Sequence, residues 1–194
     1  MSATISVLFD GYSRIDASKN IMHANCTCTL IKSKGLNVIV DSMTPWDKEK
    51  LVEALAKDHK IEPSEINYVV STHGHSDHLG NNNLFLNAVH IVGQSVSKHD
   101  EYYLDAFKDG SFVITDEVQV FTTPGHTLDS VSVKVCTPNG IVVVAGDLFE
   151  CQQDLNDEAI WKNAGSEDVE KQKANRKMCL EMADFIIPGH GKMC

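Results

Sequence analysis

Four side chains that can bind metal ions lie within six consecutive residues of this sequence, at His73, His75, Asp77 and His78. Neutral imidazole is the commonest metal ligand in proteins, and carboxylates often accompany it. In an extended segment His73 and His75 would point to the same face, while a loop would turn Asp77 and His78 elsewhere. The run could therefore supply ligands to two metal ions. The alternative is a solvated polar loop that happens to contain three histidines.

Three later turns repeat one pattern, in which an apolar segment is followed by glycine and a residue that can bind metal. They are Thr-Pro-Gly-His ending at His126, Ala-Gly-Asp ending at Asp147, and Pro-Gly-His ending at His190. Glycine lets the backbone approach a neighbour closely, so these turns can crowd around one point. Taken singly, each could be a structural histidine or an ordinary aspartate at the end of a strand. Together with the first run they predict a metal centre.

The segments that must position these residues are mostly apolar strands. Strands are expected at residues 4–9, 24–31, 36–40, 67–71, 89–92, 111–115, 118–122, 130–137, 140–145 and 185–187. One helix should begin at Pro45 with Thr44 as its N-cap, and a longer one should span residues 167–183 with Ser166 as its cap. In the longer helix Ala174, Met178 and Met182 recur at helical spacing. Residues 95–109 are expected to form a loop or a broken helix.

This order of elements predicts an α+β fold in which two sheets pack face to face with helices outside, a four-layer αββα sandwich. The length of 194 residues fits a single domain over residues 1–194. In strand–helix–strand units, binding sites lie at the carboxyl ends of the strands, which is where the candidate ligands occur.

The composition narrows the classes of function. A net charge of -10 argues against a general nucleic-acid binder, because phosphate binding depends on clustered Lys and Arg. No apolar run is long enough to cross a bilayer, and residues 1–6 do not resemble a secretory signal. We therefore expect no membrane association, and we interpret the six cysteines as reduced thiols of a cytosolic or nuclear protein.

These motifs together resemble the metallo-β-lactamase fold superfamily, in its binuclear hydrolase branch. The resemblance extends from the strand that ends at Asp41 to His190. It implies that His73, His75 and His126 hold one metal, that Asp77, His78 and His190 hold a second, and that Asp147 bridges them. It also implies that Asp41 supports the first histidine loop from behind the ligands. Two zinc ions per chain are expected, although the carboxylates also admit iron or manganese.

The chemistry implied is hydrolysis by a metal-bound hydroxide, with Asp77 as a metal ligand and possible proton acceptor. Residues 70–78, 142–150 and 187–191 resemble most closely a small subgroup of the superfamily. That subgroup is described as a homodimeric endoribonuclease of cytosol and nucleus that acts on the 3′ end of histone pre-mRNA, so an RNA substrate is implied. Glu150, in the Gly-Asp-x-Phe-Glu phrase, is either an additional site residue or a surface carboxylate.

Two other functions remain open from the sequence. One is a small-molecule thioester or ester hydrolase of the glyoxalase II type. The glutathione thioesterases of that type carry a helical region after the final histidine, whereas His190 is followed here by four residues. A glutathione substrate is therefore disfavoured. The other function is metal binding without catalysis.

Overall fold

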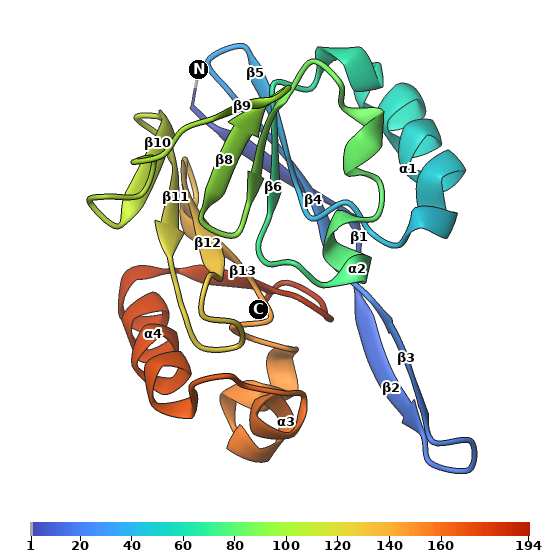
Figure 1. Cartoon of the computed structure of the whole chain (residues 1–194), viewed down its shortest axis with the longest axis vertical. Coiled ribbons are helices and arrows are strands. Elements are labelled where there is room, and N and C mark those ends of the chain that lie inside the picture. Colours follow the sequence, from blue (N-terminus) through green and yellow to red (C-terminus); the bar gives the residue numbers. More distant parts are fainter. Residues whose placement is uncertain (1) are drawn as a thin grey trace.

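Two β-sheets form the centre of the structure, a computed structural model that describes residues 2–194 (Figure 1). The first sheet has seven strands in the order β1-β4-β5-β6-β7-β8-β9. Their bounds are Thr4–Phe9, Cys28–Ser33, Leu36–Val40, Tyr68–Ser71, Val89–Val92, Ser95–Lys98 and Glu101–Tyr102. The second sheet has five strands in the order β10-β11-β12-β13-β14. Their bounds are Ser111–Thr115, Val118–Thr122, Val131–Thr137, Gly140–Gly146 and Phe185–Pro188.

The remaining strands and the helices lie around these sheets. Strands β2 (Tyr12–Asp16) and β3 (Ile21–Asn25) form a separate hairpin that projects from the body of the molecule (Figure 1). The α-helices are α1 (Lys48–Ala54), α2 (Ser76–Leu79), α3 (Glu158–Asn163) and α4 (Val169–Met182). A π-helical turn η2 (Leu55–His59) continues α1, and short 3-10 turns occur at η1 (Pro45–Asp47), η3 (Pro63–Glu65), η4 (Asn82–Leu84) and η5 (Gln152–Leu155).

The apolar residues of the central strands alternate between two cores, which makes the layers. In β5, Val38 and Val40 face the second sheet, while Ile39 packs on the other side with Leu51 and Leu55 of the α1–η2 segment. In the second sheet, odd and even positions of β13 divide in the same way between the sheet interface and the side covered by α4. The fold is therefore the expected αββα sandwich.

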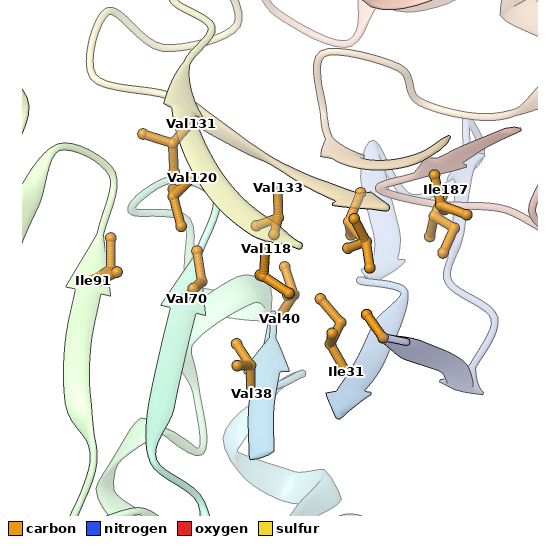
Figure 2. Packing of buried hydrophobic residues seen from close by; sticks show 14 of the residues in the cluster. Ile31, Val38, Val40, Val70, Ile91, Val118, Val120, Val131, Val133 and Ile187 are labelled. Atoms are coloured by element: carbon orange, nitrogen blue, oxygen red, sulfur yellow. The ribbon is translucent and has the colours of Figure 1, made fainter. Parts of the chain in front are cut away.

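Valines from both sheets fill the interface between them. Figure 2 shows Val38, Val40 and Val70 of the first sheet facing Val118 and Val133 of the second, and all five are fully buried. Each buried valine contributes about 1.5–3 kcal/mol relative to exposure. This core fixes the two sheets against each other and so fixes the edge at which their loops meet.

That edge collects the carboxyl ends of five strands. Strands β5 and β6 are parallel, as are β13 and β14, and β11 runs in the same direction as β13 because both are antiparallel to β12. The two sheets touch there, where the Val131 amide donates to the Thr72 carbonyl at 2.9 Å. The candidate ligands His73, His126, Asp147 and His190 all follow these strand ends.

Several details differ from the sequence predictions. The expected strand over residues 24–31 is interrupted at residues 26–27, and its first part belongs to the β2–β3 hairpin. Residues 95–109 were predicted as loop or broken helix, but they contain β8 and β9, which extend the first sheet to its edge. Thr44 precedes a 3-10 turn without capping it, although its hydroxyl donates to Asp47 at 2.6 Å.

The longer helix was predicted with the wrong cap and the wrong inner face. It begins at Val169, and the side chain of Asp168 rather than that of Ser166 accepts from its first turn. Ala174 and Met178 are exposed, whereas the buried positions are Gln172, Arg176 and Cys179. The apolar periodicity failed here because two of the three inward side chains are polar.

Residues 1–6 are not expected to form a secretory signal. Met1 of this segment lies outside the described residues. No helix within residues 2–194 is both long enough and apolar enough to span a membrane. The single domain over residues 1–194 stays a prediction.

Candidate metal centre

The first histidine run lies where β6 ends, and it forms a loop followed by one helical turn. His73 lies two residues after the end of the strand, His75 occupies the N-cap position of α2, and Asp77 and His78 belong to that helix. The His78 amide donates to the His75 carbonyl at 3.0 Å, which closes the turn. The run is therefore a tight loop rather than an extended segment. This loop still places His73 Nε2 and His75 Nδ1 2.8 Å apart.

The three later turns bring His126, Asp147 and His190 to the same place. His126 Nε2 lies 3.2 Å from His75 Nδ1 and 3.5 Å from Asp147 Oδ2. His190 Nε2 lies 3.2 Å from the same carboxylate oxygen. All seven residues that the sequence predicts as ligands therefore meet, although His190 follows His73 by 117 positions in the sequence.

Two glycines allow this crowding. Gly146 has φ +54°, a conformation that side chains resist, and a Cβ there would lie 2.4 Å from Thr72 Oγ1. A Cβ on Gly189 would lie 1.9 Å from Asp147 Oδ1. Glycine therefore precedes Asp147 and His190 because a larger residue would not fit at either position.

The seven side chains divide into two groups that share Asp147. His73, His75 and His126 present nitrogens to one side of its carboxylate, and His73 Nε2 lies 3.7 Å from Asp147 Oδ2. On the other side, His78 Nε2 lies 3.2 Å from Asp147 Oδ1 and 3.8 Å from an oxygen of Asp77. That Asp77 oxygen lies 3.8 Å from His190 Nε2. One carboxylate therefore lies between two ligand triads.

The outward nitrogens of these histidines fix which nitrogen faces the centre. His78 Nδ1 donates to Asp41 at 2.9 Å, His126 Nδ1 donates to the Gly165 carbonyl at 2.7 Å, and His190 Nδ1 donates to the Asn25 carbonyl at 3.0 Å. In each neutral ring the proton is then on Nδ1, so Nε2 directs a lone pair inward. These backbone and carboxylate acceptors set the orientation of the rings.

Asp41 connects this arrangement to the neighbouring strand end. Its carboxylate accepts from the Thr72 amide at 2.8 Å and from the Thr72 hydroxyl at 3.0 Å, besides His78. Because the Thr72 hydroxyl donates to Asp41, its oxygen is left to accept from His73 Nδ1 at 3.2 Å. Asp41 therefore orients His78 directly and His73 through Thr72.

The electrostatics of the centre favour a positive charge beside Asp147. Burial lowers the pKa of His73 and of His126 below the ordinary imidazole value, which keeps their lone pairs free. Burial alone would also lower the pKa of His78 and His190, but the Asp147 carboxylate outweighs it, and the pKa of His190 rises to about 9. Burial would raise the pKa of Asp147, but the surrounding imidazoles hold it well below its usual value.

A pair of zinc ions fits these donors. Two nitrogens bound to one tetrahedral zinc at about 2.0–2.1 Å lie about 3.3 Å apart, close to the spacings between the inward atoms. His78 Nε2 and Asp147 Oδ1 are buried and lie 3.2 Å apart, yet neither has a hydrogen-bond partner among residues 2–194, so two lone pairs face each other there when the ring is neutral. Two lone pairs only 2.8 Å apart, at His73 and His75, also call for a proton or a cation between them. The donor set thus suits divalent metal binding.

The sequence did not point to the residues that hold Asp147 and its loop from behind. On α4, Gln172 Nε2 donates to the Asp147 carbonyl at 3.0 Å, and Arg176 donates to the Leu148 carbonyl at 2.8 Å. Arg176 also pairs with the buried Asp154 at 2.8 Å. The sequence signal that could have identified them is a pair of polar residues four positions apart in a helix, because such residues lie on the same helix face.

Glu150 is buried within this centre rather than on the surface. Its carboxyl oxygen lies close to the ligand atoms of Asp147 and His190. Burial, followed by the charge of Asp147, raises the pKa of Glu150 to about 8. The alternative that it is a surface carboxylate is therefore wrong.

Two hollows open onto the centre. The narrower, of about 80 Å³, is lined by ligand residues that include His75, Asp77 and Asp147. The larger, of about 490 Å³, is bounded by the β2–β3 hairpin and the α3 segment, with Ile15 and Ile160 on its walls. Glu150 and His190 line both hollows, so the two adjoin at these side chains.

Comparison with known proteins agrees with this geometry. The family model described as the metallo-β-lactamase superfamily matches residues 23–190. The metallo-β-lactamase domain-containing protein 1 of Xenopus laevis is 38% identical over 192 residues, which cover 97% of this chain and 79% of that protein.

Solved structures with the same fold are more distant in sequence. The AiiA protein of B. thuringiensis, with N-decanoyl-L-homoserine at its active site, matches with a TM-score of 0.69 at 19% identity, over 97% of this chain and 92% of that one. The dizinc quorum-quenching lactonase AidC matches with a TM-score of 0.63 at 16% identity, over 88% and 73% of the two chains. At these identities the likeness concerns the fold.

Proposed function

Since the chain belongs to the metallo-β-lactamase superfamily, we propose that it is a binuclear metal-dependent hydrolase that cleaves RNA, with the 3′ end of histone pre-mRNA as its substrate. The observation that carries the hydrolase proposal is the pair of ligand triads joined by Asp147. The choice of RNA is supported by the resemblance of residues 70–78, 142–150 and 187–191 to the subgroup described as acting on that RNA.

In the proposed enzyme, His73, His75 and His126 would hold one zinc ion and Asp77, His78 and His190 would hold the other, with the Asp147 carboxylate available to both groups. Two such ions supply a water of lowered pKa and withdraw charge from a phosphoryl or carbonyl oxygen.

The chain's own residues have two tasks in this reaction. The acceptors behind His78, His126 and His190 keep the ligand lone pairs turned inward before any substrate arrives, which avoids reorganisation during the reaction. Asp77 accepts the proton of the attacking water at a carboxylate oxygen. It is the most exposed carboxylate of the centre, with 17% of its side chain accessible against 5% for Asp147.

A second candidate, hydrolysis of a small ester, lactone or thioester, is favoured by the larger hollow. Its volume of about 490 Å³ lies within the range of small-molecule sites, and its walls include the apolar side chains of Ile15, Met22 and Ile160. The net charge of -10 also suits a neutral substrate better than a polyanion. The name of AidC describes a lactonase.

Cleavage assays on one metal-analysed preparation distinguish these candidates. A labelled single-stranded RNA with a histone pre-mRNA 3′ segment and a panel of esters, lactones and thioesters are tested with wild type, His75→Ala and Asp147→Ala. His59→Ala, in η2 outside the ligand set, is the matched control. We expect RNA cleavage that falls more than roughly 100-fold in both ligand variants and persists in the control.

Each other outcome of these assays has a definite meaning. Ester turnover without RNA cleavage would overturn the RNA proposal in favour of the second candidate. The absence of both activities from protein that carries its metals would leave metal binding without catalysis. The homodimer and the location in cytosol and nucleus stay predictions, which light scattering and imaging of a tagged chain would test.

A further inference from the structure

Glu150 is a buried carboxylate of the centre that the two ligand triads do not use. Only 4% of the residue is exposed. Its Oε1 atom meets no hydrogen-bond donor anywhere in residues 2–194. Buried acceptors in native proteins are nearly always paired, because an unpaired one costs free energy, so this atom calls for an explanation.

Hydrogen bonds to both the amide and the carbonyl of Glu150 hold its backbone in place. Its amide donates to Asp154 Oδ2 at 2.6 Å, and its carbonyl accepts from the His190 amide at 2.8 Å. Asp154 is in turn paired with Arg176. This network fixes the position of Glu150 and leaves its carboxyl group free to meet a ligand.

Glu150 lines both of the adjoining hollows. It lines the narrow one together with Asp77 and Asp147, and the wide one beside the hairpin residues Arg14 and Met22. A substrate that extends from the wide hollow toward the ligand triads would lie beside Glu150. The group of the substrate that it meets therefore lies close to the bond that is cleaved.

We propose that Glu150 accepts a hydrogen bond from the ribose 2′-hydroxyl beside the scissile phosphate and thereby selects RNA over DNA. This inference rests on the proposed RNA hydrolase function. When ionised, the carboxylate can only accept hydrogen bonds, so its partner must be a donor. Phosphate diester oxygens carry no proton to donate, whereas the 2′-hydroxyl does and is also what distinguishes RNA from DNA.

This arrangement would select RNA because it disfavours a substrate that lacks the 2′-hydroxyl. A site built to bond a substrate hydroxyl strongly rejects an analogue without it, because the buried acceptor is then left unpaired. The competing explanation is that Glu150 is a metal ligand, since its carboxyl oxygen can reach a common point with Asp147 and His190. The test must separate these two roles.

The experiment compares three forms of one oligonucleotide on the holoenzyme, with ribose, 2′-deoxyribose or 2′-O-methylribose at the nucleotide 5′ to the cleaved bond. Glu150→Met removes the acceptor and Glu150→Gln keeps one. Asp157→Asn changes another carboxylate of the wide hollow and keeps its helix-capping oxygen, so it is the matched control. Cleavage, the affinity of each oligonucleotide and the zinc content are measured for every variant.

We expect wild type to prefer ribose by roughly 100-fold or more in kcat/KM, with tighter binding of the ribose form. In Glu150→Met this preference should fall below about threefold, while Glu150→Gln and Asp157→Asn retain most of it. All variants should keep the zinc content of wild type.

Each of four results would overturn the inference. An unchanged ribose preference in Glu150→Met, or none in wild type, would refute the role of Glu150 while RNA cleavage stands. A loss of zinc from both Glu150 variants would make the residue a ligand. Failure of wild type to cleave any RNA would refute the proposed function itself, and the inference with it.

Discussion

Replacing Asp41 by asparagine should weaken one of the two proposed metal sites and leave the other nearly unchanged. Asp41 is buried and accepts from His78 Nδ1 at 2.9 Å and from the Thr72 amide at 2.8 Å. Its φ of +58° is tolerated by asparagine, so the backbone should persist. The amide can still accept from Thr72, but its NH₂ group would oppose the proton on His78.

The size of the effect follows from the bond that is lost. A hydrogen bond to a charged group contributes about 1.5–3 kcal/mol, and each 1.4 kcal/mol is a factor of about ten in affinity. The expected loss is therefore roughly 10–100-fold at the site of Asp77, His78 and His190, which matches the usual effect of losing a partner behind a metal ligand. Protonation of His78 on Nε2 instead, which the asparagine would favour, would remove the inward lone pair.

Competitive zinc titration against a chromophoric chelator measures the two affinities separately. Asp184→Asn is the matched control, because Asp184 accepts from the Ile141 amide at the opposite end of β13 from Asp147. The reasoning fails if Asp41→Asn keeps both zinc affinities within about threefold of wild type. It fails equally if the loss occurs only at the site of His73, His75 and His126.

Three other changes have expected outcomes. Gly189→Ala places a Cβ 1.9 Å from Asp147 Oδ1, so we expect about 1–3 kcal/mol of destabilisation in urea denaturation and a lower zinc content. Arg176→Met leaves Asp154 buried without its partner and should cost about 3–5 kcal/mol by the same measurement, whereas Lys177→Met on the exposed face should cost little. Removal of metal by a chelator should lower the melting temperature by about 5–10 °C in calorimetry, reversed by added zinc, and an unchanged melting temperature would contradict metal binding to the folded state.

The sequence predicted which side chains cluster better than it predicted the elements around them, and the reason is physical. A histidine or aspartate that follows an apolar strand can be recognised in the sequence. Parallel strands place their carboxyl ends at one edge of a sheet, independently of the conformation of the loops. The inward face of α4 was mispredicted because Gln172 and Arg176 are buried by their bonds to loop carbonyls, which hydrophobic spacing does not report. The β2–β3 hairpin was missed because its side chains are mostly exposed and lack a clear alternation.

Glu150 illustrates a different limit of the sequence. A carboxylate three residues after a ligand can point to solvent or into the centre, and no local pattern decides between them. The decision comes from Arg176 and Asp154, whose network fixes the Glu150 amide, and from the contact with the His190 backbone. These partners are distant in the chain, so only the fold reveals that the carboxyl group is buried.

The centre also explains why two sheets are needed. His73, His75, Asp77 and His78 come from the first sheet, and His126, Asp147 and His190 come from the second. Neither half offers a complete pair of triads, since each triad takes at least one ligand from each sheet. The valine interface that fixes the sheets against each other therefore sets the distances between ligands, and packing changes far from the centre should alter metal affinity before they alter the fold.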